Sequence, residues 1–294
     1  MFKSTVARII RKLNYYHMLD ALPDKMYLQL IYWERLGRRL HLNPPVTFNE
    51  KLQWLKLNDR KDIFTVMVDK KDAKAFVAER IGDEYIVKTL GVWDHYDDID
   101  FSELPGRFVL KCSHDSGGLI ICRDKSTLDH TKAKTKIEKS LSNNYYISGR
   151  EWPYKNVKPC IIAEEYLEDS KGSTCLTDYK FYCFHGTPHY LYVSTGMEDH
   201  STARISFLTL DWKFAPFGRA DYKEFETLPE KPERLEDMIE IAKKLSAGTK
   251  FLRVDLYEIN GKIYFSELTF FPCSGMMPFT NDKYDKLLGD MINL

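Results

Sequence analysis

The sequence predicts an α+β protein whose sheets are mainly antiparallel. Three observations lead to this prediction. Helical patterns of apolar residues fill the chain up to Gly82, short apolar runs of strand length follow, and several neighbouring runs are joined by turns too short for a crossover helix. With 294 residues, the chain is long enough to bury a core divided over two or three lobes.

The composition excludes several classes of protein. Hydrophobic residues make up 44% of the chain and aromatic residues 14%, which excludes an intrinsically disordered protein. The 43 Lys and Arg residues balance the 43 Asp and Glu residues, so no net positive charge indicates a nucleic-acid partner. The six cysteines include no Cys-x-x-Cys pair, which disfavours a zinc site, and three lie in apolar runs, which is typical of a reducing compartment. No apolar run approaches the roughly 18 residues that span a bilayer, and no signal peptide is recognisable, so we expect a cytoplasmic protein.

Residues 1–68 are expected to form a helical N-terminal region. At its start, apolar residues recur at helical spacing, and Arg8, Arg11 and Lys12 occupy the other side of the helix. Residues 1–40 contain eight Lys or Arg residues against three Asp or Glu residues. A basic amphipathic helix of this kind either packs on its own protein or lies on an anionic membrane surface, such as the inner face of the cell membrane.

The later elements are marked by caps, turns and changes of periodicity. Thr47 and Glu50 form the pattern of a capping box that begins a helix, and Gly82 is expected to end a helix that begins near Lys70. Asn260-Gly261 is the strongest signal for a two-residue turn between antiparallel strands. Strands are expected at Tyr85–Leu90, Phe108–Cys112, Leu119–Cys122, Cys160–Leu167, Tyr179–Phe184, Tyr190–Ser194, Phe251–Ile259 and Lys262–Thr269, and further helices at Thr127–Leu141 and Glu233–Leu245.

A lysine followed by a pair of glycines forms the first candidate site. Lys111 lies near the end of the run Phe108–Cys112, and Ser116, Gly117 and Gly118 follow in a small polar loop. Adjacent glycines let backbone N–H groups converge on a phosphate, and the lysine adds a positive charge. The segment is not a Walker A loop, because Gly-x-x-x-x-Gly-Lys is absent. An ordinary hairpin with a long loop is the alternative.

Two carboxylates on the last hairpin form the second candidate site. Asp255 and Glu267 lie on opposite strands, and two facing oxygen ligands suit Mg²⁺, which takes its other ligands from substrate phosphates. A two-residue turn would place Asp255 opposite Ser266 and send Glu267 to the other face. We therefore predict a bulged loop, with Gly261 in the left-handed conformation, that brings the two acids together. The alternative is a pair of solvated carboxylates on an outer face of the sheet.

Two further features belong with these candidates. Arg253 lies two residues before Asp255 and hence on the same face of the strand, where it serves either as a counter-ion or as a clamp on a transferring phosphate. The run Cys160–Leu167 ends in acidic residues. A strand that leaves its sheet there offers one C=O and one N–H to the edge of an adenine, although the start of an exposed loop explains the same residues.

Taken in order, these segments resemble the TupA-like ATP-grasp family, which is linked to bacterial cell-surface polysaccharides. The resemblance covers most of the chain and rests on the ordered set of motifs. These are Pro45–Trp54, Asp69-Lys70, Phe108–Gly118, Ala163–Leu167, Asp178–Phe181, Arg253–Tyr257 and Phe265–Thr269. The resemblance implies an ATP-grasp fold in which residues 69–294 form the catalytic region, with a glycine-loop lid subdomain at about residues 106–165 and a metal-binding core subdomain over residues 166–294.

The resemblance also implies roles for the matching residues. The lysines would contact the ATP phosphates under the glycine-rich loop, a hinge would hold the adenine through its backbone, and an arginine would steady an acyl phosphate. ATP contacts are thus implied for Lys70, Lys111, Ser116, Gly117, Gly118, Glu164, Glu165, Tyr166, Leu167 and Asp178, magnesium contacts for Asp255 and Glu267, and catalytic contacts for Arg253 and Lys180. Asp178 and Lys180 lie on a strand that faces either the nucleotide or the acceptor.

Two positions depart from the family's general pattern. Thr269 stands where many ATP-grasp enzymes have an Asn two residues after the metal glutamate, which argues against a second full-strength magnesium site. His114 lies inside the glycine-rich loop and is a further catalytic candidate. It either holds the loop by a hydrogen bond to the backbone or reaches the γ-phosphate when the loop closes.

The implied function is that of an ATP-dependent ligase that joins a carboxylate to an amine through an acyl phosphate, with ATP and Mg²⁺ as cofactors. The expected substrates are a small-molecule or saccharide carboxylate and an amine such as an amino acid, in the synthesis of a capsule-like or teichuronopeptide-like polymer. The alternatives are a glycosyltransferase of polysaccharide synthesis, an ATP-grasp kinase and a non-catalytic nucleotide-binding module. The nucleotide that is bound, and the product that is released, separate these functions.

Overall fold

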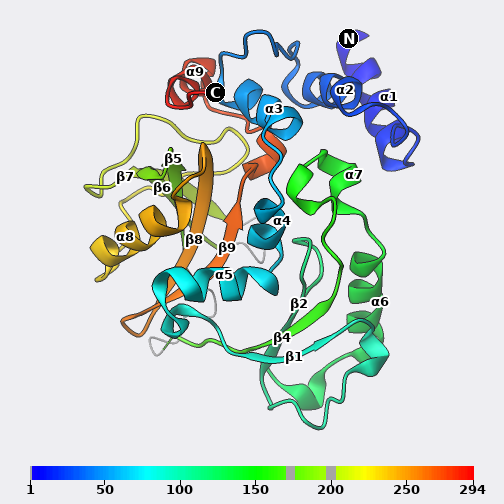
Figure 1. Ribbon diagram of the computed structural model, residues 1–294, viewed down its shortest axis with the longest axis vertical. Coiled ribbons are helices and arrows are strands. Elements are labelled where there is room, and N and C mark those ends of the chain that lie inside the picture. The colour runs from blue at the N-terminus through cyan, green and yellow to red at the C-terminus, as the bar shows by residue number, and fades with distance from the viewer. Residues whose placement is uncertain (1, 170–175, 197–202) are drawn as a thin grey trace.

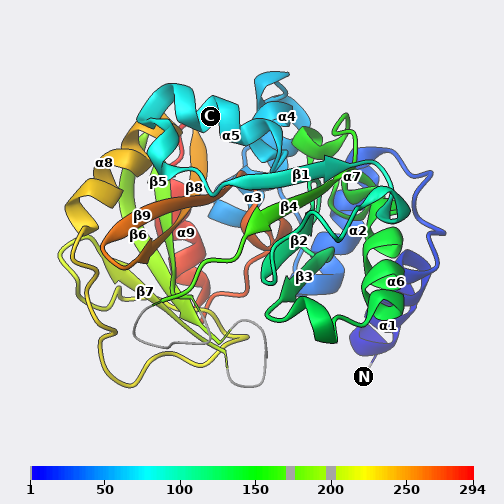
Figure 2. The ribbon, with the colours of Figure 1, turned by 90° about the horizontal axis from the view of Figure 1, so that it is seen from below.

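The structure, a computed structural model, describes residues 2–169, 176–196 and 203–294 of the chain (Figure 1). Over these residues the strands form two antiparallel sheets that lie side by side, with helices packed around them (Figure 2). The predicted α+β class with antiparallel sheets is therefore confirmed. None of the described helices is both long and apolar enough to cross a membrane.

The smaller sheet has four strands in the order β1-β4-β2-β3. Apolar side chains of β2, β4 and α6 form the core of this lobe. Cys112, Cys122 and Cys160, the cysteines of the apolar runs, are buried, whereas Cys175 lies outside the described residues. The elements are β1 (Thr89–Trp93), β2 (Phe108–Cys112), β3 (Leu119–Cys122), β4 (Ile161–Glu165) and the helix α6 (His130–Leu141).

The larger sheet has five strands in the order β7-β6-β5-β8-β9. The amphipathic helix α8 packs its apolar side chains, among them Leu235, Met238 and Leu245, into the core of this lobe. The elements are β5 (Asp178–Phe184), β6 (Thr187–Thr195), β7 (Arg204–Thr209), β8 (Phe251–Ile259), β9 (Lys262–Thr269) and α8 (Leu235–Ser246).

The remaining helices surround the two sheets. α1 and α2 pack on each other around a small apolar core of their own, whereas α3, α4 and α5 contribute side chains to the core of the larger sheet. α7 lies between α2 and the sheets (Figure 1). The helices are α1 (Phe2–Tyr15), α2 (Asp24–Leu36), α3 (Phe48–Asn58), α4 (Ile63–Val68), α5 (Asp72–Ile81), α7 (Tyr145–Gly149) and α9 (Asp282–Asp290).

The predicted helix ends are confirmed, and one predicted strand is wrong. The Thr47 hydroxyl accepts from the Glu50 N–H, and the Glu50 carboxylate accepts from the Thr47 N–H, which completes the capping box at α3. α5 ends at Gly82. The expected strand Tyr85–Leu90 is displaced: residues 85–88 do not form a strand, Tyr85 and Ile86 pack against the core of the larger sheet, and β1 begins only at residue 89.

Candidate active site

Asp255 of β8 lies directly opposite Glu267 of β9. The turn between the strands has two residues, Asn260 and Gly261, which both have positive φ (54° and 73°). The register shifts by one residue next to Asp255, where Ser266 has no partner on β8. The predicted pairing of the two acids is therefore confirmed. The predicted place of the bulge is wrong, because it lies beside the acids and not in the turn.

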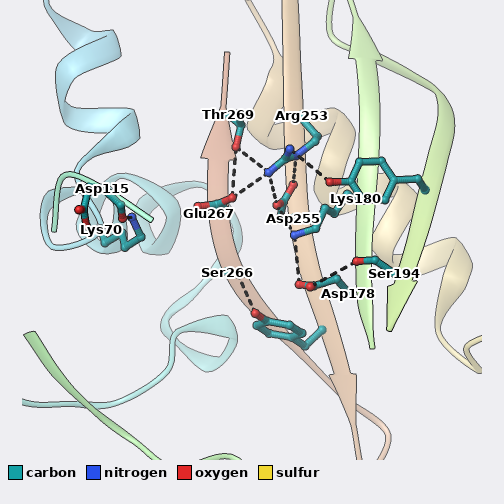
Figure 3. Close-up of polar contacts among 12 residues, drawn as sticks. Lys70, Asp115, Asp178, Lys180, Ser194, Arg253, Asp255, Ser266, Glu267 and Thr269 are labelled. Atoms are coloured by element: carbon teal, nitrogen blue, oxygen red, sulfur yellow. Dashed lines mark hydrogen bonds and ion pairs between the residues drawn. The ribbon is translucent and has the colours of Figure 1, made fainter. Parts of the chain in front are cut away.

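The guanidinium of Arg253 lies between the two carboxylates (Figure 3). Nε and Nη2 donate to the two oxygens of Asp255 at 2.7 Å each. Nη2 also donates to Glu267 Oε1 at 2.8 Å and to Thr269 Oγ1 at 3.0 Å. Burial alone would lower the pKa of Arg253, but the carboxylates hold it well above its usual value. In this arrangement Arg253 is the counter-ion of both acids.

Lys180 is a second cation in contact with Asp255. It lies opposite Asp255 on the neighbouring strand, with Nζ at 2.7 Å from Asp255 Oδ2 and 3.2 Å from Asp178 Oδ1. Burial opposes the charge of Lys180, but the two carboxylates hold its pKa well above the usual value. Asp255 is fully buried, and burial raises the pKa of its carboxyl although Arg253 and Lys180 oppose the shift. Asp178 and Lys180 of β5 therefore lie beside the acidic hairpin.

Glu267 is the more accessible of the two acids, with 31% of its side chain exposed. Burial would raise the pKa of Glu267, but the positive charges of Arg253, Lys70 and Lys180 lower it to about 2. The carboxylate is therefore ionised at neutral pH. It lines a cavity of about 400 Å³.

The residues around Glu267 fit a magnesium ion that takes most of its ligands from phosphate and water. Glu267 offers an ionised carboxylate to the cavity, Asp255 stands opposite it, and the Thr269 hydroxyl adds a neutral oxygen. No group of three or more His, Cys, Asp or Glu residues suited to a metal occurs in the described part of the chain. Since Mg²⁺ is commonly held by one or two carboxylates together with substrate phosphates, this donor set suits it.

The loop between β2 and β3 is organised by Asp115. Its Oδ1 accepts from the Gly118 N–H at 3.1 Å, and its Oδ2 accepts from the Ser140 hydroxyl of α6. A Cβ at Gly118 would overlap the Sγ of Cys112 and the Ser140 hydroxyl, so close packing requires glycine there. Asp115 and Ser116 line the same cavity as Glu267. The glycine-rich loop and the acidic hairpin therefore share one cavity.

Lys70 is the lysine that reaches this cavity from the loop side. Its N–H donates to the Ser113 carbonyl at 3.0 Å, its Nζ donates to the Asp115 carbonyl, and its side chain lines the cavity with Glu267 (Figure 3). Lys111 lies elsewhere. Its Nζ is 2.6 Å from Glu164, and it is not one of the cavity residues.

Glu164 binds two lysines at once. Lys111 of β2 lies 2.6 Å from one of its oxygens and Lys74 of α5 lies 2.7 Å from the other. Burial would raise the pKa of Glu164, but the two lysines hold it below its usual value. The sequence analysis did not identify Lys74, although its position one helical turn after Lys70 is a signal that could have pointed to it.

The predicted adenine hinge begins at Glu164 itself and extends to Leu167. The Glu165 N–H donates to the Lys88 carbonyl at 3.0 Å, and Tyr166 and Leu167 then continue beyond the end of β4 without taking part in its pairing. The guanidinium of Arg107 lies 5.4 Å from the centre of the Tyr166 ring. The strand expected at Cys160–Leu167 is therefore shorter in the structure, and the chain leaves the sheet after Glu165, within the acidic end of the expected strand.

His114 is buried in the glycine-rich loop. Its Nε2 lies 3.0 Å from the Asn143 carbonyl, and its Nδ1 has no partner among the described residues. Of the two roles considered for His114, the observed contact is the one that holds the loop through a backbone hydrogen bond.

One wall of the cavity could not be predicted from the sequence. This wall comes from segments far apart in the chain, and no motif or spacing links them. Burial raises the pKa of Glu151, and the nearby Lys56 opposes this shift. The missed residues are Arg35 of α2, Tyr145, Ser148, Gly149, Glu151 and Tyr154 in and after α7, and Phe271, Pro272, Cys273 and Ser274 after β9.

Comparison with known families gives one match that covers most of the chain. The family described as TupA-like ATPgrasp matches residues 50–293. The match begins within α3, so α1 and α2 precede it. No curated protein matches the chain.

Solved structures that resemble the chain include two D-alanine–D-alanine ligases. The enzyme from Bacillus anthracis, complexed with ATP, is 17% identical with a TM-score of 0.44, and the match covers 88% of this chain and 69% of that one. The enzyme from Helicobacter pylori is 15% identical with a TM-score of 0.47, over 84% and 69% of the two chains. An N5-carboxyaminoimidazole synthetase from Staphylococcus aureus is 13% identical with a TM-score of 0.37, over 69% and 44%.

Proposed function

The chain belongs to the TupA-like ATP-grasp family, and from this membership we propose that it is an ATP-dependent ligase that joins a carboxylate to an amine. One observation carries the proposal. Lys70 and the loop residue Ser116 line the same cavity as Arg253 and Glu267. A triphosphate in this cavity would meet positive charge and the glycine-rich loop on one side and a magnesium-binding carboxylate on the other.

The nucleotide would extend from the hinge to the cavity. Backbone groups of Glu165–Leu167 would hold the adenine edge. Lys111 and Lys74, which flank Glu164, would lie along the inner phosphates, and Lys70 would lie at the terminal phosphate. The facing carboxylates of Asp255 and Glu267 would hold magnesium, which would supply positive charge to the phosphates of the nucleotide.

The proposed reaction has two steps. A substrate carboxylate oxygen attacks the γ-phosphorus of ATP, the bond from phosphorus to the bridging oxygen breaks, and ADP leaves with that electron pair. The amine nitrogen then attacks the carbonyl carbon of the acyl phosphate, phosphate leaves, and the nitrogen gives up a proton. The products are an amide, ADP and phosphate.

In this reaction the protein contributes position and charge. Arg253 is fixed by Asp255 and presents Nη2 beside Glu267, where it would stabilise negative charge on the transferring phosphoryl group. Lys180 and Asp255 would act as positioning residues for Arg253. The glycine-rich loop would keep water from the acyl phosphate, which water would otherwise hydrolyse.

The test replaces the unknown amine with hydroxylamine, which converts an acyl phosphate to a stable hydroxamate. Protein, Mg·ATP and hydroxylamine are incubated with a panel of uronic acids and amino acids. Formation of one hydroxamate for each ADP supports the ligase. A stable phosphorylated product without hydroxamate would assign a kinase instead. Stabilisation by nucleotide sugars but not by ATP would favour a glycosyltransferase.

We propose further that the carboxylate belongs to a saccharide of a cell-surface polymer, and that α1 brings the enzyme to the membrane where such polymers are assembled.

The outer surface of α1 supports the membrane contact. Arg8 and Lys12 are exposed there together with Ile9, Tyr15 and Tyr16, whose exposed fractions are 52%, 76% and 68%. Basic and aromatic side chains on one surface suit an anionic membrane interface. Sedimentation with vesicles that contain phosphatidylserine tests the contact, and equal sedimentation with neutral vesicles would contradict it.

A further inference from the structure

The cavity beside Glu267 extends past the groups that the proposed reaction uses. Tyr145 and Tyr154 form an aromatic part of the further wall, with their ring centres 4.7 Å apart and the rings edge to face. Arg35 of α2 and Ser274 after β9 belong to the same wall. A volume of about 400 Å³ lies in the range of small-molecule binding sites, so an organic substrate has room beside the phosphoryl group.

The loop after β9 is fixed in place from behind. Cys273 and Ser274 have φ values of 53° and 54°, in the left-handed region that side chains other than glycine rarely adopt. Lys56 of α3 is fully buried and donates to the Ser274 carbonyl at 2.8 Å and to the Gly149 carbonyl at 2.7 Å. These bonds hold the loop in its conformation and join it to α7.

The helix that carries Arg35 is fixed to the same wall. Tyr27 Oη of α2 donates to the Ser148 carbonyl at 3.0 Å, and Tyr146 Oη of α7 donates to Asp24 Oδ2 at 2.7 Å. The side chain of Arg35 therefore starts from a backbone position that is defined relative to the cavity. An arginine held at such a position can recognise a ligand group in a specific place.

Arg35 differs from the other cations of the cavity in its partners. Arg253 and Lys70 are bound within the protein, as described above. Arg35 makes no hydrogen bond or ion pair within the described residues, whereas Arg38, three residues later, binds Asp282 and Asp285. A guanidinium presents N–H donors in a planar fork that matches a carboxylate or a phosphate. The charge of Arg35 acts on Glu151 of the same wall, whose pKa it lowers against the larger effect of burial, but the N–H donors of Arg35 have no hydrogen-bond partner within the described residues.

We propose that Arg35 binds an anionic group of an organic substrate, separate from the carboxylate that reacts beside Arg253 and Glu267. The substrate is either an acid with a second carboxylate or phosphate, or an amine that carries such a group. Its carbon frame lies against Tyr145 and Tyr154. This inference rests on the proposed function, because it assigns the far end of the substrate in the same cavity.

The test measures binding without turnover. The full-length protein with saturating Mg·ADP is titrated by calorimetry with matched probes: pentanoate, glutarate and 4-phosphonobutanoate for the acid, and alaninamide and alanine for the amine. In the wild type, the probe with the additional anionic group is expected to bind at least about tenfold more tightly than its partner, because hydrogen bonds to charged groups are strong. If glutarate or 4-phosphonobutanoate binds more tightly than pentanoate, the acid substrate carries the additional anionic group. If alanine binds more tightly than alaninamide, the amine substrate carries it. Arg35→Gln is expected to abolish the preference, and Arg39→Gln, at an exposed position outside the cavity wall, to keep it.

The inference would be overturned by absence of binding by every probe, by equal affinities within both matched sets, or by a preference that survives in Arg35→Gln. Weaker binding of Mg·ADP by Arg35→Gln, with the probe preference intact, would also overturn it by assigning Arg35 to the nucleotide. Failure of the proposed function shows separately as absence of hydroxamate with Mg·ATP, and it does not alter the measured probe affinities. Arg35 is exposed, so the variant is expected to fold, and its thermal midpoint without ligand checks this.

Discussion

Asp255 faces Glu267 across β8 and β9 because one residue, Ser266, is left out of the pairing of these strands. A regular ladder from the two-residue turn would place Glu267 on the other face of the sheet, away from Arg253. The bulge therefore allows a tight turn and a pair of facing acids in the same hairpin. Bulges are common beside active sites, where they redirect a side chain.

Glu267→Gln is expected to abolish the magnesium-dependent part of ATP binding while the fold survives, because the amide lacks the charge that the metal requires. Thermal shift with ATP, with and without Mg²⁺, measures this. A ligand at a hundred times its dissociation constant stabilises a protein by roughly 2.7 kcal/mol, which is large enough to detect. Glu240→Gln, at an exposed position on α8, is the control. An unchanged response to Mg²⁺ in Glu267→Gln would remove the metal assignment.

Lys70→Ala and Lys111→Ala are expected to change the affinities for ADP and ATP in different ways. Lys111→Ala should weaken ADP and ATP binding alike, because Lys111 lies with Glu164 near the hinge. Lys70→Ala should weaken ATP binding more than ADP binding, because Lys70 lies with Glu267 in the cavity. Each loss should amount to about 1.5–3 kcal/mol, the range for a hydrogen bond to a charged group. Calorimetric titration of both variants measures the losses, and the reverse pattern would exchange the two assignments.

The two glycines of the loop are expected to differ in their tolerance of alanine. Gly118→Ala should destabilise the protein by about 1–3 kcal/mol, because its Cβ would overlap Cys112 and Ser140. A Cβ at Gly117 would approach only Asp115 Oδ2, at 3.3 Å, so Gly117→Ala should fold normally. Weaker ATP binding by Gly117→Ala would then report close approach of the backbone to the phosphates. Urea unfolding and ATP titration of both variants provide the comparison, and equal stability of the two would contradict the packing argument.

Lys180→Met is expected to destabilise the fold, because it leaves the buried carboxylate of Asp255 and the half-buried carboxylate of Asp178 with less compensating charge. Removal of one partner from a buried ion pair costs about 3–5 kcal/mol. The free energy of unfolding in urea gives the value. Lys88→Met, at an exposed position, controls for loss of a lysine. A Lys180→Met protein as stable as the Lys88→Met protein would show that Arg253 alone neutralises these acids.

Acid should destabilise the wild type more steeply than Glu267→Gln. Burial would raise the pKa of Glu267, but the positive charges of Arg253, Lys70 and Lys180 outweigh it and lower the pKa from its usual value of 4.5 to about 2 in the folded protein. The ionised carboxylate therefore contributes stability above pH 4.5 that is lost as the pH falls towards 2. Unfolding free energies of both proteins across this window give the difference. Parallel curves would show that the charge of Glu267 does not stabilise the fold.

Much of the fold could be predicted from the sequence because its signals are local. The capping box at Thr47, the Asn260-Gly261 turn and both strands of that hairpin follow from neighbouring residues. α7 was not predicted, because five residues are too few to show a helical period. The place of the bulge is visible in the alternation of buried residues along β9. The buried residues of β9 change from odd positions at Ile263 and Phe265 to an even position at Leu268.

The two halves of the site also differ in how well the sequence predicts them. Asp255, Glu267 and Arg253 share one hairpin, so strand periodicity and register were enough to bring them together. Arg35 and Tyr145 line the same cavity because α2 packs on α7, and no spacing in the sequence predicts this packing. Lys111 was expected at the ATP phosphates beside the glycine-rich loop, and its Nζ contacts Glu164 outside the cavity. The two project from the same face of neighbouring strands, and this pairing depends on the strand order of the smaller sheet.

The attachment of α2 to α7 has a practical consequence for fragments of this protein. A fragment trimmed to the family match would begin at residue 50 and lack both α1 and α2. Tyr146 and Arg150 would then lose Asp24, and the five-residue α7 would have one fewer support beside the cavity. Such a fragment would retain every strand yet lack Arg35. Screening truncated proteins for substrates would thus discard a recognition element that a search guided by sequence motifs does not reveal.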